Sequence, residues 1–201
     1  MNRPTILRAA RELIVGGAQA VVTLLLSPVL RNRYNQWGAT AEELDASMPG
    51  DDLVAEPKLG YTRAITIDAP PGAVWPWLAQ FGQGRGGFYS YDALENLVGC
   101  KIHSTDQLLP EHQDPQPGDL IRSGPAGKRY AAWQILDADP PRYLVLMGAD
   151  PETLEAPSVV DIVPDRGYVA STWQWELRPL ADGDATRLTV RQRLTYSPRQ
   201  R

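Results

Sequence analysis

Two side chains in the middle of the chain are candidates for proton transfer, Asp92 and His103. Asp92 stands at the start of an expected helix with Glu95 further along it, and paired carboxylates can perform acid–base catalysis. His103 follows this helix closely and is better placed than His112 for a general base. Neither a nucleophile motif nor a fixed acidic partner accompanies them. A polar helix surface and an ordinary loop histidine are therefore the alternatives to catalysis.

A glycine-rich run, Gly82-Gln-Gly-Arg-Gly-Gly87, satisfies the G-x-G-x-x-G pattern of dinucleotide-binding loops. That chemistry requires the run to lie between a strand and a helix of a parallel βαβ unit. Here the run follows an expected helix, and the later strands have an antiparallel pattern. We therefore interpret it as a turn between two helices. Arg85 within the turn is a candidate partner for an anionic ligand group, or else a surface arginine.

The composition excludes several functional classes. One cysteine, Cys100, excludes an internal disulfide and a cysteine-rich metal site, and two histidines leave little for a histidine-based metal centre. We expect neither a metal nor another cofactor. The net charge of −4, without a long basic run, gives no reason to expect nucleic acid. A chain of 201 residues with 43% hydrophobic residues can form one domain with a real core, plus an appendage.

Two short helices are expected on either side of the glycine turn. In the first, the apolar residues have the spacing of one helical face: Val74, Trp77, Leu78 and Phe81. In the second, the same spacing recurs: Tyr91, Leu94 and Val98. Ser90 is placed as the N-cap of the second helix, and Asp92 lies where a negative charge suits the helix dipole. Large aromatic side chains on both helices predict the wall of a cavity.

Strand alternation is clearest near the C-terminus. Over Val169–Leu180 and Leu188–Tyr196, apolar residues alternate with polar and charged ones, and Asp182-Gly183 between them indicates a hairpin. This pattern predicts one apolar face and one charged, solvated face. Gln192 interrupts the apolar face, and a buried polar group needs a partner such as a ligand or a bound water. With a further strand at Tyr61–Asp68, the order predicts an α+β fold with helices on one side of an antiparallel sheet.

Residues 13–30 form an uncharged run flanked by arginines. As a helix the run measures ~27 Å, slightly less than a ~30 Å hydrocarbon core. We interpret it as a single membrane anchor on an unspecified side of the membrane, with a buried or amphipathic helix of a cytoplasmic protein as the alternative. One face of the run is small and polar, and such a face suits helix packing or water: Gly16, Gln19, Thr23 and Ser27. The expected organisation is a hydrophobic segment at 1–33, a linker at 34–59 and a ligand-binding domain at 60–201.

The chain from about Gly60 to Tyr196 resembles the START and pollen-allergen-like superfamily, also called SRPBCC, which includes polyketide cyclase-like proteins and has the helix-grip fold. Thr62-Arg-Ala-Ile-Thr-Ile-Asp-Ala-Pro-Pro71, followed by Val74-Trp-Pro-Trp-Leu78, is similar to the usual strand-to-helix entry of that superfamily. Gly87-Phe-Tyr-Ser-Tyr-Asp-Ala-Leu-Glu-Asn-Leu97 is similar to a signature of one bacterial branch. In that branch a hydrophobic N-terminal segment often precedes the domain.

The resemblance implies a large apolar cavity between a curved antiparallel sheet and a long C-terminal helix. Members bind lipids, sterols, polyketides or plant hormones, and some cyclise or hydroxylate their ligands. With the aromatic pattern, it gives the following ligand-binding candidates: Trp77, Phe81, Phe88, Tyr89, Tyr91, Trp133, Trp173, Trp175 and Gln192. The sequence departs from the superfamily after Tyr196, where the closing helix is missing. We expect Leu13–Leu30, a partner chain or a membrane surface to cover the apolar face instead.

Three functions are compatible with these observations. The preferred one is binding of an apolar small molecule or lipid by a domain tethered to a membrane through residues 13–30. The second is an enzyme of cyclase or aromatase type that acts on a polyketide-like substrate through Tyr89, Tyr91, Asp92 or His103. The third is a protein-interaction module that docks a partner on its open sheet.

Overall fold

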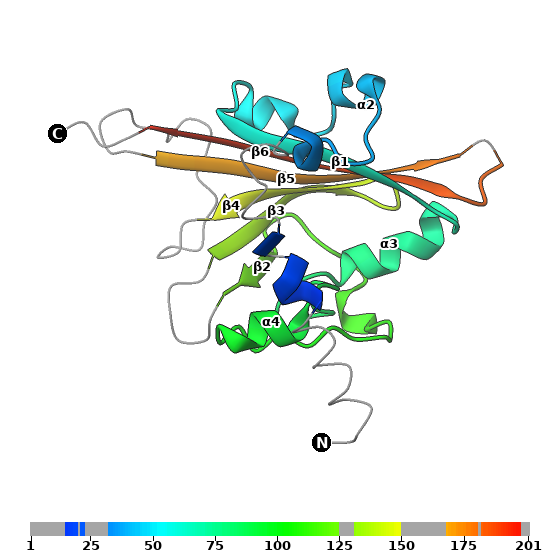
Figure 1. The fold of residues 1–201 in the computed structure, drawn as a ribbon. Coiled ribbons are helices and arrows are strands. Elements are labelled where there is room, and N and C mark those ends of the chain that lie inside the picture. The colour runs from blue at the N-terminus through cyan, green and yellow to red at the C-terminus, as the bar shows by residue number, and fades with distance from the viewer. Residues whose placement is uncertain are drawn as a thin grey trace.

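The computed structural model describes residues 15–19, 21–22, 32–124, 131–149, 168–180 and 182–197. Six strands form one antiparallel sheet in the order β1-β6-β5-β4-β3-β2 (Figure 1). Their bounds are β1 Leu59–Ile67, β2 Leu120–Ser123, β3 Ala131–Asp139, β4 Tyr143–Ala149, β5 Tyr168–Pro179 and β6 Thr186–Ser197. The helical elements are α2 Ala41–Asp45, η1 Asp51–Val54, α3 Pro71–Ala79, α4 Asp92–Leu97 and η2 Pro110–His112. The predicted α+β class is confirmed, with an antiparallel sheet and two short helices, α3 and α4, after the first strand.

The longest ladder joins β5 and β6. The pairing runs from Tyr168 opposite Ser197 to Pro179 opposite Thr186. Gly183 lies in the connecting turn with φ +75°, where glycine is favoured, and its N–H donates to the carbonyl of Leu180. The hairpin predicted from Asp182-Gly183 is therefore confirmed. We call the side of the sheet that carries α3 the helix face, and the side that carries α2 and η1 the back face.

Helix α3 packs its aromatic side chains onto the helix face. Pro71 occupies the first turn, where its missing N–H costs nothing. Trp75 and Ala79 are the buried residues of the helix, whereas Trp77 is half-buried. The core cluster also draws on the strands: Ile121, Ile135, Leu144, Leu146, Trp175 and Leu177. Fully burying one such side chain contributes about 1.5–3 kcal/mol, so this cluster anchors α3 to the sheet.

Helix α4 lies further out and has no buried residue. Leu97 and Val98 at its C-terminal end are 75% and 65% exposed. Asp92 lies in the first turn as expected. The expected N-cap is wrong: Tyr91 occupies that position, and the Ser90 hydroxyl donates to Glu95 Oε1 at 2.6 Å instead.

The back face is covered, and the prediction of a solvated charged face is wrong. Residues from the stretch expected as a linker form α2 and η1 and lie against this face (Figure 1). Arg191 is 4% exposed, and Thr172 and Gln174 are 0% and 1% exposed. Carboxylates of the covering segment neutralise the arginines of β6, and its backbone carbonyls accept their remaining hydrogen bonds, which is why a charged face can be buried.

Part of the N-terminal run packs against α4. Residues 15–19 and 21–22 are helical and lie on the side of the sheet that carries α3 and α4 (Figure 1). A Cβ on Gly16 would stand 2.6 Å from Leu94 Cδ1, and the Tyr91 hydroxyl donates to Gln19 Oε1 at 2.9 Å. Thr23, Ser27 and most of the uncharged run fall outside the described residues. Among those described, no helix has the length and apolar character needed to span a bilayer.

Candidate functional site

An aromatic cluster forms the centre of the helix face. Phe81, just beyond the C-terminal end of α3, makes edge contacts with three rings. Its ring centroid lies 4.9 Å from that of Phe88 and 5.3 Å from those of Trp173 and Trp175. Trp133 of β3 extends the cluster, 5.3 Å from Trp173. Five of the predicted ligand-binding residues are therefore brought together by α3, the glycine turn and two strands.

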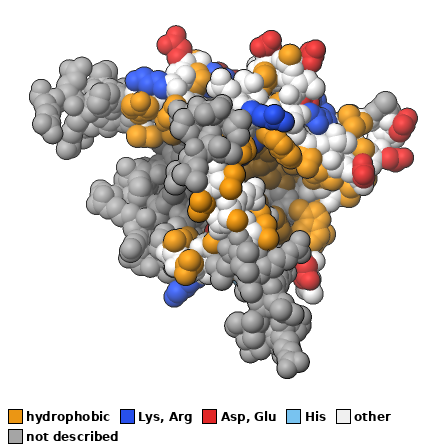
Figure 2. All heavy atoms as spheres, in the orientation of Figure 1, with side chains coloured by type: hydrophobic (Ala, Val, Ile, Leu, Met, Phe, Trp, Pro, Cys, Tyr) orange, Lys and Arg blue, Asp and Glu red, His pale blue; other side chains and the backbone are white. Residues whose placement is uncertain are grey.

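Hydrophobic side chains also gather around a hollow on the surface of the molecule (Figure 2). A contiguous exposed apolar surface generally marks a binding site. On this side Ile65 of β1 is 46% exposed. The centre of the helix face is thus filled by the aromatic cluster, and exposed apolar side chains lie at its margin.

The loops beside the cluster are held by Gln80, whose side chain is fully buried. Its amide nitrogen donates to the Tyr89 hydroxyl at 2.6 Å and to the carbonyl of Gln107 at 3.0 Å. Its amide oxygen accepts from the backbone N–H of Leu109 at 2.9 Å and from the Gln113 amide at 3.0 Å. Gln80 was not predicted from the sequence, because its partners lie far along the chain and no motif marks them.

Three predicted ligand-binding residues lie outside the aromatic cluster. Trp77 contacts Tyr89 edge to face at 6.0 Å, and Tyr89 is 41% exposed. Tyr91 points its hydroxyl at the N-terminal segment through Gln19. These three aromatic side chains lie at α3 and just before α4, and they do not line the sheet.

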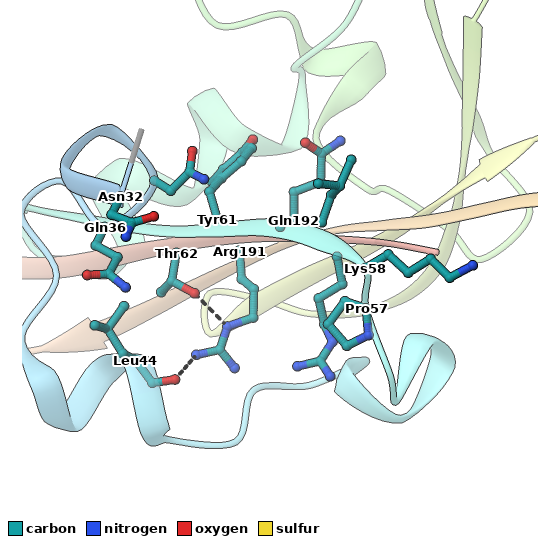
Figure 3. A pocket seen from close by; sticks show the side chains of 13 residues that line it. Asn32, Gln36, Leu44, Pro57, Lys58, Tyr61, Thr62, Arg191 and Gln192 are labelled. Atoms are coloured by element: carbon teal, nitrogen blue, oxygen red, sulfur yellow. Dashed lines mark hydrogen bonds between the residues drawn. The ribbon is translucent and has the colours of Figure 1, made fainter. Parts of the chain in front are cut away.

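A row of polar groups crosses three strands beside the cluster. Tyr61 of β1 lies opposite Gln192 of β6, and Gln192 lies opposite Trp173 of β5. Directly paired residues of an antiparallel sheet share a face. Figure 3 shows Tyr61 and Gln192 pointing to one side of the sheet, and Thr62 and Arg191 to the other. We call Tyr61, Gln192 and Trp173 the polar row.

The polar row has unused hydrogen-bonding capacity. Trp173 Nε1 is buried and has no hydrogen-bond partner in the described part of the chain. Burial raises the pKa of Tyr61, and the charge of Arg63 and the nearby indole N–H of Trp173 oppose this effect. The indole N–H and the Tyr61 hydroxyl are close, but they do not meet hydrogen-bond geometry. The Gln192 amide has no hydrogen bond to a described residue. Gln192 and Trp173 are among the predicted ligand-binding residues, whereas Tyr61 is not, although strand alternation in β1 was a signal for it.

A polar pocket of about 380 Å³ opens beside the start of β1 (Figure 3). Tyr61 and Gln192 contribute to its lining, as do the amides Asn32, Asn35 and Gln36 from the segment before α2. Arg191 also lines it, but its guanidinium is already bound to Asp51, Thr62 and carbonyls of α2. Two more cations line the pocket: Lys58 Nζ donates to the carbonyl of Tyr196, and Arg193 donates to the carbonyls of Val54 and Ala55. The pocket therefore combines amide and backbone groups with cations that already have partners.

The two candidates for proton transfer lie around α4 and the loop after it, and neither of them lines this pocket. Both carboxylate oxygens of Asp92 accept hydrogen bonds from Ser104, one from its N–H and one from its hydroxyl, each at 2.6 Å. His103 is exposed in the loop. Asp92 thus fixes the loop that contains His103. Within the described residues, no cluster of three or more His, Cys, Asp and Glu side chains could hold a metal ion.

Arg85 of the glycine turn binds the C-terminal end of the helix that precedes it, α3. Arg85 Nη2 donates to the carbonyl of Ala79 at 3.0 Å, which places a cation at the C-terminal end of α3. Burial lowers the pKa of Arg85, and the charge of Asp119 opposes this effect. The turn is closed by hydrogen bonds between Gly82 and Gly87 in both directions. The interpretation as an inter-helix turn is thereby confirmed.

Comparison with solved structures finds matches of low sequence identity and low TM-score. A Polyketide_cyc-like protein from Corynebacterium glutamicum is 18% identical over 68% of this chain and 65% of its own, with a TM-score of 0.36. An HSP90 activator from Plasmodium falciparum is 11% identical over 67% and 72%, with a TM-score of 0.38. The Aha1 dimer from Colwellia psychrerythraea is 12% identical over 66% and 74%, with a TM-score of 0.36.

At such identities and TM-scores these neighbours carry no argument about family or function. No protein-family model and no curated protein matches the chain. The class of the protein therefore rests on its own architecture, an antiparallel sheet with helices and aromatic side chains on one face.

Proposed function

We propose that this domain binds an apolar small molecule or lipid that carries at least one oxygen acceptor. The observation that carries the proposal is the N–H of Trp173, which is buried within the aromatic cluster and has no hydrogen-bond partner among the described residues. A buried donor without an acceptor costs about 1–3 kcal/mol, and a ligand carbonyl or hydroxyl removes this cost.

The neighbouring groups suit the same ligand. The aromatic and aliphatic side chains of the helix face supply the apolar contact area from which affinity arises. The Tyr61 hydroxyl and the Gln192 amide can each donate or accept, so the polar row orients an oxygen-bearing end of the ligand. An apolar site with a few well-placed polar groups is the usual design of small-molecule pockets.

Native mass spectrometry of the full chain tests the proposal. We expect an apolar molecule to copurify, and the neutral dye Nile red to bind with increased emission. A chain that carries no ligand and does not bind Nile red would contradict the proposal. A defined oligomer with no ligand would favour the interaction module.

A matched pair of variants tests the role of the Trp173 N–H. Trp173→Phe retains an aromatic ring without the donor, whereas Trp37→Phe alters a tryptophan that is 56% exposed. We expect Trp173→Phe to weaken displacement of Nile red by dodecanol about two- to tenfold, the value of one hydrogen bond, and to leave displacement by naphthalene unchanged. Equal effects of Trp173→Phe on both competitors would show that the N–H has no part in binding.

We also propose that residues 13–30 hold the protein at a membrane, because the run is uncharged and flanked by arginines. Flotation of the full chain with phosphatidylcholine vesicles tests this: a tethered protein floats in high salt and is released only by detergent. A protein that stays in the aqueous fraction would contradict the tether. The ligand proposal does not depend on this result.

A further inference from the structure

The helix face carries one cation that differs from the arginines of the back face. Arg63 lies two residues from both Tyr61 and Ile65 in β1. Because side chains two residues apart share one face of a strand, the Arg63 side chain leaves the sheet on the helix face. Among the described residues, no other charged side chain occupies a helix-face position of β1, β5 or β6. The other helix-face positions of these strands are apolar or neutral, so a charge at this one is an exception to the pattern.

The back-face arginines of β6 have carboxylate partners. Arg187 Nε lies 2.7 Å from Glu43 Oε1, and Arg191 Nη1 lies 2.6 Å from Asp51 Oδ2. Arg193 Nη1 lies 3.4 Å from Asp51 Oδ1. No described carboxylate lies within ion-pair distance of Arg63.

The guanidinium of Arg63 is held in place while two of its nitrogens remain free. Its Nε donates to the carbonyl of Tyr34 at 2.9 Å, and its central carbon lies 4.5 Å from the centroid of the Tyr61 ring. Neither Nη1 nor Nη2 has a hydrogen bond to a described residue. Stacking on an aromatic ring orients a guanidinium without using its donors. The free edge of Arg63 is thus presented next to the polar row.

We propose that Arg63 binds the carboxylate of an amphipathic ligand whose apolar part lies on the helix face. Two free guanidinium nitrogens match the two oxygens of a carboxylate, which is the geometry of a bidentate pair. The nearby Lys58 is less suited, because its Nζ already donates to the carbonyl of Tyr196 at 2.5 Å and lies over that residue's ring. This inference rests on the proposed function and names the ligand class for the same face.

Competition for bound Nile red tests the inference, with dodecanoate and dodecanol as competitors of equal chain length. For the unaltered full chain we expect dodecanoate to compete better, with a preference that decreases as salt is added, because Arg63 is exposed. Arg63→Gln should weaken dodecanoate about three- to tenfold and leave dodecanol unchanged.

Two further variants separate charge from structure. Arg63→Lys retains the charge but loses the bond to Tyr34, and we expect it to retain part of the preference for dodecanoate. Arg122→Gln removes an exposed arginine of β2, at the opposite edge of the sheet, and should change neither competitor. If dodecanoate and dodecanol compete equally, or if Arg63→Gln weakens both alike, Arg63 does not select a carboxylate and the inference is wrong. The ligand proposal would survive that result, whereas a lack of Nile red binding would remove both.

Discussion

Glu43 and Arg187 form a two-pronged ion pair on the back face, with Nε to Oε1 at 2.7 Å and Nη2 to Oε2 at 2.8 Å. The pair ties α2 to β6, which are separated by more than a hundred residues in the chain. The Glu43 carboxylate also accepts from the N–H of Thr40 in a capping box. One carboxylate therefore begins a helix and docks it on the sheet.

The Glu43–Arg187 pair makes the stability of the fold depend on pH. Hydrogen bonding from Arg187 lowers the pKa of Glu43 from 4.5 to about 2, against the opposing effect of burial. Because the folded-state pKa is depressed, the stabilisation is present above pH 4.5 and is lost as the pH falls toward 2. We expect Glu43→Gln to lower the free energy of unfolding at pH 7 by about 2 kcal/mol, and to reduce the loss between pH 4.5 and 2. Urea unfolding at several pH values measures this, with Glu56→Gln at an exposed position as control. Equal stability of the Glu43→Gln variant and the unaltered chain at pH 7 would contradict the prediction.

The close approach of Gly16 to Leu94 predicts opposite effects at two neighbouring glycines. Gly17→Ala meets no described residue within 4 Å and should stabilise the helical segment by about 0.5–1 kcal/mol through helix propensity. Gly16→Ala places a Cβ 2.6 Å from Leu94 Cδ1 and 3.2 Å from the Tyr91 ring, so we expect it to loosen the contact with α4. Hydrogen exchange of residues 15–19 and of α4 should become faster in Gly16→Ala only. Identical exchange in the two variants would show that the segment does not pack on α4 in solution.

Gln80 should be much more sensitive to substitution than an exposed glutamine. Gln80→Leu leaves the Leu109 N–H and the Gln107 carbonyl without their partner, and each lost buried partner costs about 1–3 kcal/mol. We expect a large decrease in melting temperature and faster proteolysis of the loop from 104 to 113. Gln107→Leu is the control, since only its backbone carbonyl takes part in the network. A Gln80→Leu melting temperature equal to that of Gln107→Leu would refute this role.

Asp92 and His103 give a direct test of the cyclase alternative. Asp92→Asn puts an amide nitrogen where Ser104 needs an acceptor, so we expect a loss of about 1 kcal/mol in stability. His103→Gln changes an exposed side chain and should leave the melting temperature unaltered. If the protein turns over a polyketide-like substrate, and His103→Gln abolishes that turnover while folding is retained, the enzyme hypothesis replaces the binding proposal. Turnover that is insensitive to both substitutions would exclude these two residues from the chemistry.

Local patterns predicted the elements of the fold well. Alternation in β5 and β6, with Asp182-Gly183 between them, predicted the hairpin and the apolar face that contains Gln192. Pro71 marked the start of α3. These features depend on periodicity and turn chemistry, which are properties of neighbouring residues.

The cover of the back face could not be predicted in the same way. Alternating arginines look the same in sequence whether water or carboxylates surround them. Arg191 is buried because Asp51 and the carbonyls of α2, far away in the chain, satisfy its donors. Only the folded arrangement of the segment before β1 provides these partners.

By itself, the sequence determined which residues alternate, where helices and turns begin, and that one face of the sheet is apolar. The tertiary structure alone decided which side chains meet. The register of β1, β6 and β5 aligns Tyr61, Gln192 and Trp173, and the path of the N-terminal segment sets Gly16 against Leu94. The physical reason is that hydrogen-bond and packing partners depend on distances in space, whereas local sequence encodes only the preferences of adjacent residues.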